Sequence, residues 1–460
     1  MTSASILAID LGSSSLRVAR VDEAARVVSI ARRRHAFRDD AARGIRPHEL
    51  AASLRSALEE VGGDGVETVV MSSLWHSVLG VDAADAPVTR AFTWESTEPD
   101  AVVPELAAVL DAEAYRARTG SYLHASYPLA GIRLLSDQGA RPARWTDLAS
   151  WLLRTVLGVR VGWSPQLAAG SAMWHQGHDE WDAETLDAVG VPRSALGEVW
   201  REPVVLGADA PAGLAGARLL PVLGDGYCDS VGIDALGPDV SALTAATSGS
   251  LRMILDGVLD DAPFGIWRYR VGSETTGLGG AISNAGNLLE WVRGTLGVDD
   301  PLAFAHADEP PAWDGLTALP ELAGERGPRY RREVSAAVSG LRGRHTAGDI
   351  GRELVFGVLG VYAAMTELMA TAQPALSRFV TAGGIVQGSP VFGQLLADAT
   401  ERTVSLSPVS ESSLRGAAVH ALGGAPAPES VREFVPRPAW SAAIRERRAA
   451  AAALDARIRG

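Results

Sequence analysis

A strand, a turn of small residues and a second strand occur twice in this chain, about half its length apart. The first copy is SILAIDLGSSSLRVARVD, residues 5–22, and the second is DVSALTAATSGSLRMILDGVL, residues 239–259. A repeated unit of this kind indicates two similarly built halves, and 460 residues are too many for one ordinary hydrophobic core. We therefore predict two lobes, residues 1–237 and 238–460, with the boundary near Gly237 and Pro238.

Strand and helix patterns alternate in the first half. After the opening hairpin, RVVSIAR (residues 26–32) is a third strand pattern, and RPHELAASLRSALEEVG (residues 46–62) carries apolar residues at helical spacing. VETVVMSSLWHSVLGVD (residues 66–82) predicts two strands around a polar elbow. This order predicts an α/β fold with a mixed sheet. At the other end, SAAIRERRAAAAALDARIRG (residues 441–460) predicts a terminal helix on the second half, without chemistry of its own.

The composition excludes several classes of function. A formal net charge of −13 argues against a nucleic-acid partner, because phosphate backbones are held by clustered cations. All 42 cationic residues are arginine, and the absence of lysine excludes the P-loop and protein-kinase mechanisms. A single cysteine, Cys228, excludes an internal disulfide. We see no apolar run as long as a membrane span and no leader segment, so we expect a cytoplasmic protein without a membrane partner.

The two small-residue turns have the composition of phosphate-binding loops. Glycine and short hydroxyl side chains let backbone N–H groups converge on an anion. The turns consist of Gly12, Ser13 and Ser14, and of Thr247, Ser248 and Gly249. A plain β-hairpin is the alternative for either turn alone. Asp10 favours the phosphate interpretation of the first turn, because a carboxylate at the end of a buried strand can hold hydrated Mg²⁺ beside it.

Two further strand ends carry chemically useful residues. In LPVLGDGYCDSVGIDAL (residues 220–236), Asp225 stands at the exit of a strand, and a helix is expected from about Cys228. Ligands bind at the carboxyl ends of strands in α/β folds, although Asp225 or Asp229 could instead cap the helix. In FVTAGGIVQGSPVFGQLLADAT (residues 379–400), a strand runs into Gly383 and Gly384, where a flat ring or a ribose could rest on the backbone.

These segments, taken in order, resemble the FGGY carbohydrate kinases. The strings are AIDLGSSS, LPVLGDGYCDSVG, TSGSLR, GGAISNAGNLLEW, LAGERGP, TAGGIVQGSPVFGQLLAD and SSLRGAA, and they span residues 6 to about 424. TSGSLR, GGAISNAGNLLEW, MSSLWHSVLGVD and TGSYLHASY resemble the gluconate kinase branch. The resemblance implies an actin-like ATPase fold, in which two ribonuclease H-like domains enclose a central cleft for ATP and a sugar. It also implies a homodimer as one possible assembly, since dimers are common in the family.

Roles follow from the resemblance position by position. Asp10 corresponds to the carboxylate that places Mg²⁺, and Asp225 to the general base that takes a proton from the attacking sugar hydroxyl. The two glycine turns correspond to contacts with the phosphates of ATP. Gly383 and Gly384 correspond to the adenosine site.

The chain departs from the gluconate kinase pattern on the sugar side. The family pattern Trp-x-Asp-x-Arg is TWESTEPD here, so that Trp94 is kept while Ser96 and Glu98 replace the charged pair. A lysine that is common after the HASY-like string is replaced by Gly131.

The remaining sugar-side candidates are two acids, one cation and three ring side chains. Glu95 and Glu98 could accept sugar hydroxyls in place of the lost pair, and Arg252 is the candidate cation for an anionic substrate. The resemblance makes His76 a ligand of sugar hydroxyls, with His124 and Tyr127 as weaker candidates. Two interpretations stay open: a kinase for a different polyol, sugar or sugar acid, and a nucleotide-binding relative that acts as a sensor.

Overall fold

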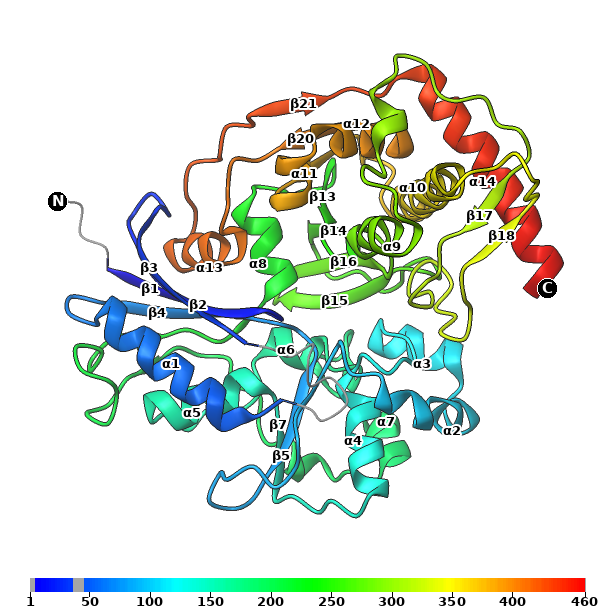
Figure 1. Ribbon diagram of the computed structural model, residues 1–460. Coiled ribbons are helices and arrows are strands. Elements are labelled where there is room, and N and C mark those ends of the chain that lie inside the picture. Colours follow the sequence, from blue (N-terminus) through cyan, green and yellow to red (C-terminus); the bar gives the residue numbers. More distant parts are fainter. Residues whose placement is uncertain (1–4, 36–44, 460) are drawn as a thin grey trace.

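The computed structural model describes residues 5–35 and 45–459, and it is built around two mixed β-sheets (Figure 1). Each has seven strands in the described part of the chain. The strands of the first sheet all precede residue 225, and those of the second all follow residue 239. The proposed lobe boundary near Gly237 and Pro238 falls between the two sets of strands.

The first sheet has the order β10-β11-β4-β1-β2-β3, and β12 also pairs with β4. Its strands are β1 (Ile6–Leu11), β2 (Ser15–Val21), β3 (Val27–Arg34), β4 (Thr68–Ser73), β10 (Val204–Val205), β11 (Arg218–Leu219) and β12 (Leu223–Gly224). β1, β2 and β3 are antiparallel neighbours, whereas β4 is parallel to β1 and β12 is parallel to β4. The carboxyl ends of β1, β4 and β12 therefore lie level at one edge of the sheet.

The second sheet repeats this arrangement, with the order β15-β16-β14-β13-β19-β20-β21. Its strands are β13 (Val240–Ala245), β14 (Gly249–Asp256), β15 (Trp267–Gly272), β16 (Thr275–Ile282), β19 (Arg378–Thr381), β20 (Thr403–Leu406) and β21 (Arg432–Phe434). As in the first sheet, an antiparallel hairpin is followed by parallel strands, here β13, β19 and β20. The expected duplication of one α/β unit is confirmed.

Helices of the first half surround the lower part of the molecule in Figure 1, except α8 (Asp225–Gly232), which lies above them beside α13 (Ser412–Leu422). They are α1 (Pro47–Val61), α2 (Val103–Val109), α3 (Ala112–Thr119), α4 (Pro128–Asp137), α5 (Leu148–Leu157), α6 (Pro165–Ala169), α7 (Ala183–Val189) and α8 (Asp225–Gly232), with 3-10 helices η1 (Glu98–Val102) and η2 (Arg193–Ala195). The strands β5 (Ser77–Val81), β6 (Phe92–Thr93) and β7 (Arg144–Thr146) form a small sheet there, and β8 (Trp174–His175) pairs with β9 (Glu180–Trp181). The α1 helix packs on β2 and β3 because its apolar residues share one face.

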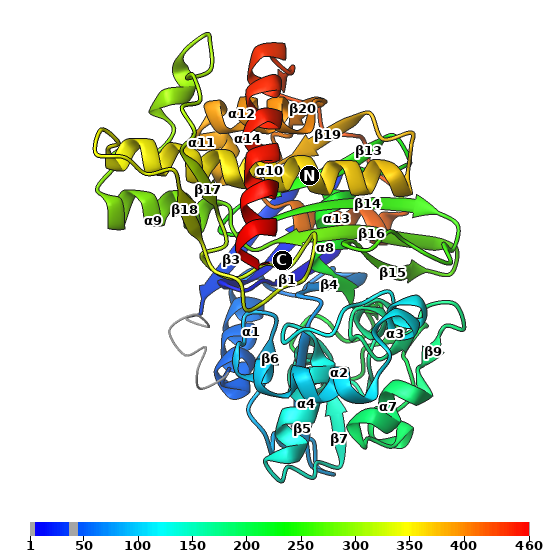
Figure 2. The same ribbon diagram turned by 90° about the vertical axis from the view of Figure 1, so that its right-hand side faces the viewer.

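Helices of the second half cover the upper part, as both ribbon views show (Figures 1 and 2). They are α9 (Gly286–Leu296), α10 (Ala347–Ala372), α11 (Gly384–Gly388), α12 (Pro390–Thr400), α13 (Ser412–Leu422) and α14 (Pro438–Arg459), with η3 (Ala303–His306). β17 (Thr317–Leu319) pairs antiparallel with β18 (Ala337–Ser339), and residues 320–336 connect them. The predicted terminal helix is confirmed as α14, which packs on α10 and α12.

The α10 helix corrects one expectation from the sequence. We expected no segment as long and apolar as a membrane span, yet α10 meets that description by length and composition alone. Its apolar side chains, among them Phe356, Leu359 and Met365, are buried against the second sheet and the neighbouring helices. It is the core helix of the second half.

One helix of the second half packs against the first half. The α13 helix belongs to the second half in sequence but packs on α8 and on β1 and β4 of the first sheet. The helices cross closely because both carry glycine at the crossing point. A Cβ at Gly416 would lie 1.8 Å from the carbonyl oxygen of Cys228, and one at Gly232 would lie 2.0 Å from that of Ser412. This pair fills the space between the sheets and joins the lobes on one side.

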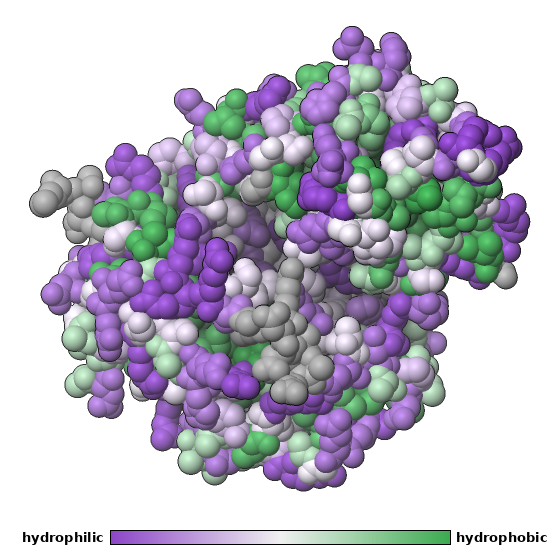
Figure 3. Space-filling model, viewed as in Figure 1, coloured by the Kyte–Doolittle hydropathy of each residue, from purple (hydrophilic) through white to green (hydrophobic). Residues whose placement is uncertain are grey.

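An aromatic contact joins the halves at another place. Trp75 of the first half meets Trp267 and Tyr269 of β15 edge to face, with ring centroids 5.4 and 5.3 Å apart. The Tyr269 hydroxyl donates to the Tyr127 hydroxyl at 3.0 Å. The space-filling view shows a hollow between the upper and lower parts of the molecule (Figure 3). Some of the residues predicted to carry chemistry, among them Thr247, Gly383 and Trp94, line hollows of the structure.

Candidate active site

The first glycine turn is a tight bend between β1 and β2. The Gly12 N–H donates to the carbonyl of Ser15 at 3.1 Å, which closes the bend over Ser13 and Ser14. His35 supports it from outside, because its N–H donates to the carbonyl of Ser14 and a ring nitrogen lies 2.8 Å from the carbonyl oxygen of Gly12. The bend therefore has the fixed backbone that an anion site requires.

Asp10 is buried directly behind this bend. Its Oδ2 accepts a 2.7 Å hydrogen bond from Arg17 across the hairpin, whereas its Oδ1 is buried without a hydrogen-bond partner in the described chain. Burial raises the pKa of Asp10 to about 6, against the lowering effect of Arg17. A buried carboxylate oxygen with no partner fits a site for a hydrated divalent cation, since Mg²⁺ is bound through one or two carboxylates and keeps several waters.

The second turn is anchored to α9. The Gly286 N–H donates to the carbonyl of Ala246 at 2.8 Å, and the Asn287 N–H donates to that of Thr247 at 3.0 Å. β14 begins at Gly249, where no larger residue fits. A Cβ there would lie 2.1 Å from the hydroxyl oxygen of Tyr362. These contacts hold Thr247 and Ser248 in place at the edge of the second sheet.

Asp225 stands at the carboxyl edge of the first sheet. Gly224 pairs with Ser73, and Leu11 pairs with the same residue from the other side, so Asp225 and Gly12 leave the sheet two strand spacings apart, roughly 10 Å. The α8 helix begins at Asp225 and not at about Cys228, so the predicted helix start was wrong by one turn. The flanking Gly224 and Gly226 are required because a Cβ at either would overlap the Trp75 ring, at 2.2 and 2.7 Å.

The Asp225 carboxylate lies in a group of acidic residues. Its Oδ1 accepts from the Gly226 N–H at 2.8 Å. Burial, followed by the like charge of Asp229, raises the pKa of Asp225 to about 7, while Arg252 opposes them and Asp10 adds a smaller rise. A carboxylate whose pKa lies near neutrality has the property expected of a general base.

Arg252 reaches from the second sheet to α8. Its Nη2 donates to Asp229 Oδ2 at 3.3 Å and to the Thr244 hydroxyl at 2.9 Å. Asp229 Oδ1 in turn accepts from the hydroxyls of Ser412 and Ser413 on α13, at 2.8 and 2.7 Å. Arg252 is thus paired with a protein carboxylate beside Asp225, and the structure does not place it with the other sugar-side candidates.

Two hollows meet at the second turn. The first, which we call the Gly383 hollow, measures about 410 Å³ and is lined by Asp229, Thr244, Thr247, Arg252 and Gly383, among others. Gly383 has a φ of 103°, a conformation that favours glycine, and Gly384 begins α11 directly after it. The structure therefore brings the Thr247 turn, Arg252 and the predicted adenosine residue Gly383 around one space.

The second, which we call the Trp94 hollow, measures about 360 Å³. Its lining includes Trp94, Glu95, Ser96, Thr97, Asp100, His124, Ser248, Ser283, Asn287, Glu325, Arg326 and Arg332. Thr247 lines both hollows. A linear ligand in the Gly383 hollow can therefore present its end to a second ligand in the Trp94 hollow.

Arg326 is the cation of the Trp94 hollow. Its guanidinium lies over the Trp94 ring, 5.2 Å from the centroid, and donates to the carbonyl of Ile282 at 3.3 Å. Burial lowers the pKa of Arg326, but arginine stays protonated at any physiological pH. Among the residues that the structure describes, Arg326 forms no ion pair, whereas Arg332 pairs with Asp100. The hollow thus contains a cation without a direct ion-pair partner above an aromatic face, and the charge of Glu95, which lines the same hollow, opposes the lowering of its pKa.

Two histidines stay neutral beside this hollow. The His76 Nδ1 lies 2.7 Å from the carbonyl oxygen of Gly170, and because a carbonyl only accepts, Nδ1 carries the proton and Nε2 is an acceptor. Burial lowers the pKa of His76 to about 4 and that of His124 to about 3. The His76 ring also packs edge to face against Tyr127, at 4.8 Å. A neutral imidazole can accept a hydrogen bond from a sugar hydroxyl.

Two other sugar-side positions point elsewhere. Glu98 forms an ion pair with Arg90 and does not line the Trp94 hollow, so the structure does not bring it to the site. Gly131 is buried within α4, where a Cβ would lie 3.1 Å from both Phe92 and Val78. Glycine, where the family commonly has lysine, therefore allows α4 to pack closely against the small sheet.

The sequence interpretation missed Arg326 and Arg332. Arg326 lies in LAGERGP, a string that carried the resemblance, but no role was assigned to it. The lost arginine at Glu98 was the available signal that another cation serves the sugar side, but the sequence interpretation assigned that role to Arg252.

Comparison with known proteins agrees with this architecture. The family models for the N-terminal and C-terminal domains of the FGGY family of carbohydrate kinases match residues 5–224 and 261–424. The chain is 26% identical to a gluconokinase from Bacillus subtilis (strain 168) over 381 residues, covering 77% of this chain and 73% of the relative. It is 24% identical to a glycerol kinase from Nocardia farcinica (strain IFM 10152) over 378 residues, covering 76% and 75%.

Solved structures are similar over nearly the whole chain. A gluconate kinase from Lactobacillus acidophilus superposes with a TM-score of 0.86 at 19% identity, and a xylulose kinase from the same organism with 0.87 at 19%, each covering 98% of both chains. These structures share the two-domain, actin-like ATPase type of fold. The chain belongs to the FGGY family of carbohydrate kinases and is a sugar kinase.

Proposed function

We propose that this kinase transfers the γ-phosphoryl group of ATP to a hydroxyl of a sugar acid, with gluconate or a related aldonate as the first candidates. The observation that carries this proposal is the unpaired Arg326 in the Trp94 hollow. A carboxylate is the natural partner of such a cation, because charge-assisted hydrogen bonds to arginine are short, bidentate and strong.

The arrangement of the hollows supports the direction of transfer. ATP would occupy the Gly383 hollow, with its adenosine near Gly383 and Gly384 and its phosphates at the Gly12 and Thr247 turns. The sugar acid would occupy the Trp94 hollow, with its carboxylate on Arg326 and its hydroxyls on Glu95, Ser96 and His124, which line it. His76 does not line this hollow but lies close enough for its charge to act on His124. Because Thr247 lines both spaces, the γ-phosphorus and the accepting hydroxyl meet there.

The chemistry follows from positioning and charge. The sugar hydroxyl oxygen attacks the γ-phosphorus as the bond from phosphorus to the bridging oxygen breaks, and ADP leaves with that electron pair. The Asp225 carboxylate accepts the hydroxyl proton. Asp10 would hold Mg²⁺ through its partnerless Oδ1, and the ion would supply charge neutralisation for the phosphates. Arg252 supports the alignment by holding Asp229 next to the base. Closure of the lobes would exclude water, which otherwise competes as the acceptor.

The experiment is a coupled assay of ADP release with MgATP and a panel of aldonates, pentuloses and polyols. We expect turnover with an aldonate and much weaker turnover with the corresponding neutral alditol. Efficient turnover of a neutral pentulose or polyol alone would contradict the assigned substrate class. ATP binding by calorimetry without turnover of any panel member would favour the alternative function, a sensor.

A further inference from the structure

One segment of the second half forms a wall of the Trp94 hollow and of a separate cavity behind it. We call residues 321–332 the strap. Its Glu325, Arg326 and Arg332 line the Trp94 hollow. Its Glu321, Pro328 and Arg329 line a cavity of about 200 Å³ between β17, α10 and α14. The residue that contacts the proposed substrate, Arg326, therefore lies on a segment with empty space on its other side.

The front of the strap is attached to the first half. Arg332 forms an ion pair with Asp100, next to the Trp94 hollow. Tyr330 stacks on Tyr122, with ring centroids 3.6 Å apart and planes inclined by 12°. These contacts fix one end of the strap, which follows Arg326 in the chain.

The back of the strap is attached to α14 by ion pairs. Arg329 Nη1 donates to Asp455 Oδ2 at 2.6 Å, and Arg331 Nη2 donates to both Asp455 oxygens at 3.0 Å. Both arginines also donate to Glu325, which precedes Arg326, at 2.8 and 2.9 Å. Asp455 is thus the group on α14 that holds the two arginines which fix Glu325.

Asp455 is suited to this role by burial and charge. It is 6% exposed and also accepts from Arg459, one helical turn later, at 2.8 Å. Burial alone would raise the pKa of Asp455, but hydrogen bonds from Arg331 and the charges of Arg329 and Arg459 outweigh it and lower that pKa. The carboxylate is therefore ionised at neutral pH and holds several cations at once.

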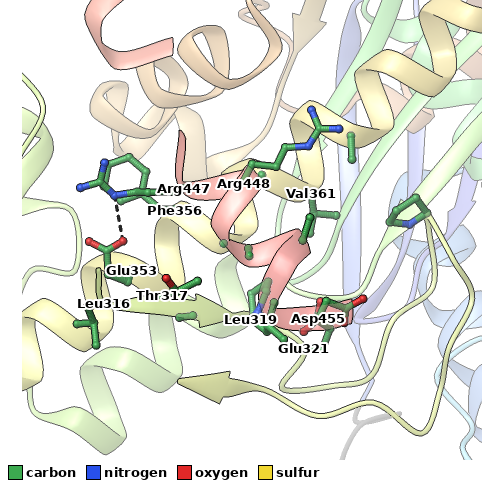
Figure 4. Close-up of a pocket in the computed structure, with 18 of the residues that line it drawn as sticks. Leu316, Thr317, Leu319, Glu321, Glu353, Phe356, Val361, Arg447, Arg448 and Asp455 are labelled. Atoms are coloured by element: carbon green, nitrogen blue, oxygen red, sulfur yellow. Dashed lines mark hydrogen bonds and ion pairs between the residues drawn. The ribbon is translucent and has the colours of Figure 1, made fainter. Parts of the chain in front are cut away.

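The cavity explains why these ion pairs matter. Figure 4 shows Asp455 and Glu321 together at one end of the cavity, and the Arg447–Glu353 pair at the other. Gly357 and Gly360 of α10 line the space between them. The strap is held at Arg326 itself by hydrogen bonds to Ser283 and Ile282. Because side chains do not fill the cavity behind it, the ion pairs of Asp455 are the charged contacts that hold its Arg329 and Arg331 on that side.

We propose that Asp455 of the terminal helix is a positioning residue for the sugar substrate: through Arg329, Arg331 and Glu325 it holds the strap that presents Arg326 to the Trp94 hollow. This inference rests on the proposed function in that it takes the Trp94 hollow as the sugar site. It gives α14 a role in substrate binding, whereas the sequence interpretation assigned it no chemistry.

The first test is steady-state kinetics of the full chain with Asp455→Asn and Arg329→Gln. Each change should raise the KM for the sugar about tenfold, which corresponds to the loss of one charge-assisted hydrogen bond. The KM for ATP and kcat should stay within about twofold, because uniform binding of the sugar alone is weakened. The double variant should cost clearly less than the product of the two single effects, since both changes remove the same ion pair.

The matched control is Glu367→Gln. Glu367 of α10 pairs with Arg448 of α14 at 2.5 Å, so it also links these two helices, but it does not contact the strap. This variant should leave the KM for the sugar unchanged. An equal rise of KM in Glu367→Gln and Asp455→Asn would show that docking of α14 in general is responsible, and would overturn the proposal.

A second measurement does not depend on the substrate. Hydrogen–deuterium exchange read by mass spectrometry should show faster exchange of the strap amides in Asp455→Asn than in the wild type or Glu367→Gln. Unchanged exchange together with an unchanged KM would overturn the role of Asp455. Faster exchange with an unchanged KM would show that the strap is loosened but that the sugar binds elsewhere, which would overturn the placement of the sugar in the Trp94 hollow.

Discussion

Replacing Arg326 by glutamine removes the only unpaired cation that the described chain places in the Trp94 hollow. The side chain keeps hydrogen-bonding capacity and much of its contact with Trp94 but loses its charge. Two unit charges about 4 Å apart attract by about 4 kcal/mol at an effective dielectric constant near 20. Desolvation of both groups cancels part of this, and hydrogen bonds to charged groups contribute about 1.5–3 kcal/mol net. We therefore expect kcat/KM for an aldonate to fall about 10- to 150-fold.

The assay compares an aldonate with its neutral alditol in the same variant. The alditol has no carboxylate to lose a partner, so its kcat/KM should change by less than about threefold, and the ratio of the two substrates carries the result. Circular dichroism and the melting temperature provide the folding control. If Arg326→Gln slows both substrates equally, or leaves the aldonate unaffected, the assignment of Arg326 to the carboxylate is wrong.

Three further predictions concern the reacting groups and the helix crossing. Asp225→Asn should lower kcat by about 10²- to 10⁴-fold with ATP affinity retained. Because the base acts only when ionised and its pKa is about 7, wild-type kcat/KM should fall as the pH drops below 7. A flat pH profile together with near-normal turnover of Asp225→Asn would show that Asp225 is not the base. Asp10→Asn should raise the Mg²⁺ concentration for half-maximal activity about tenfold or more, as read from a magnesium titration; an unchanged titration would exclude Asp10 as the metal-side carboxylate. Gly416→Ala should reduce the free energy of unfolding, measured in urea, by about 2–3 kcal/mol because the added Cβ overlaps the Cys228 carbonyl. Gly294→Ala, whose Cβ has no atom within 4 Å, should raise that free energy by about 0.5–1 kcal/mol. Equal effects of the two changes would contradict the close crossing of α8 and α13.

Local patterns were sufficient to predict the sheet hairpins. Short apolar segments on both sides of Gly12 and of the Thr247 turn indicate strand, bend and strand within about twenty residues, and the structure confirms both as β1–β2 and β13–β14. The start of α8 was predicted too late because glycine on both sides of Asp225 suggests a loop. The glycines are there for another reason: the Trp75 ring, which is distant in sequence, occupies the space that side chains would need.

Contacts between distant segments could not be predicted in this way. Arg326 follows Trp94 by more than two hundred residues, and only the packing of the two lobes brings its guanidinium over that ring. The Glu98 carboxylate could accept sugar hydroxyls, but in the structure it forms an ion pair with the nearby Arg90. The crossing of α13 onto the first sheet likewise depends on Gly416 and Gly232 meeting across the chain, which periodicity within either helix does not encode.

The central claim is that the two hollows hold ATP and a sugar acid with the reacting atoms between them. Phosphorus NMR of the protein with MgATP and gluconate tests it most directly. The account predicts that a phosphomonoester signal and ADP grow in equal amounts, and that Asp225→Asn abolishes both. Release of inorganic phosphate without a phosphomonoester, across gluconate and related aldonates, would contradict it.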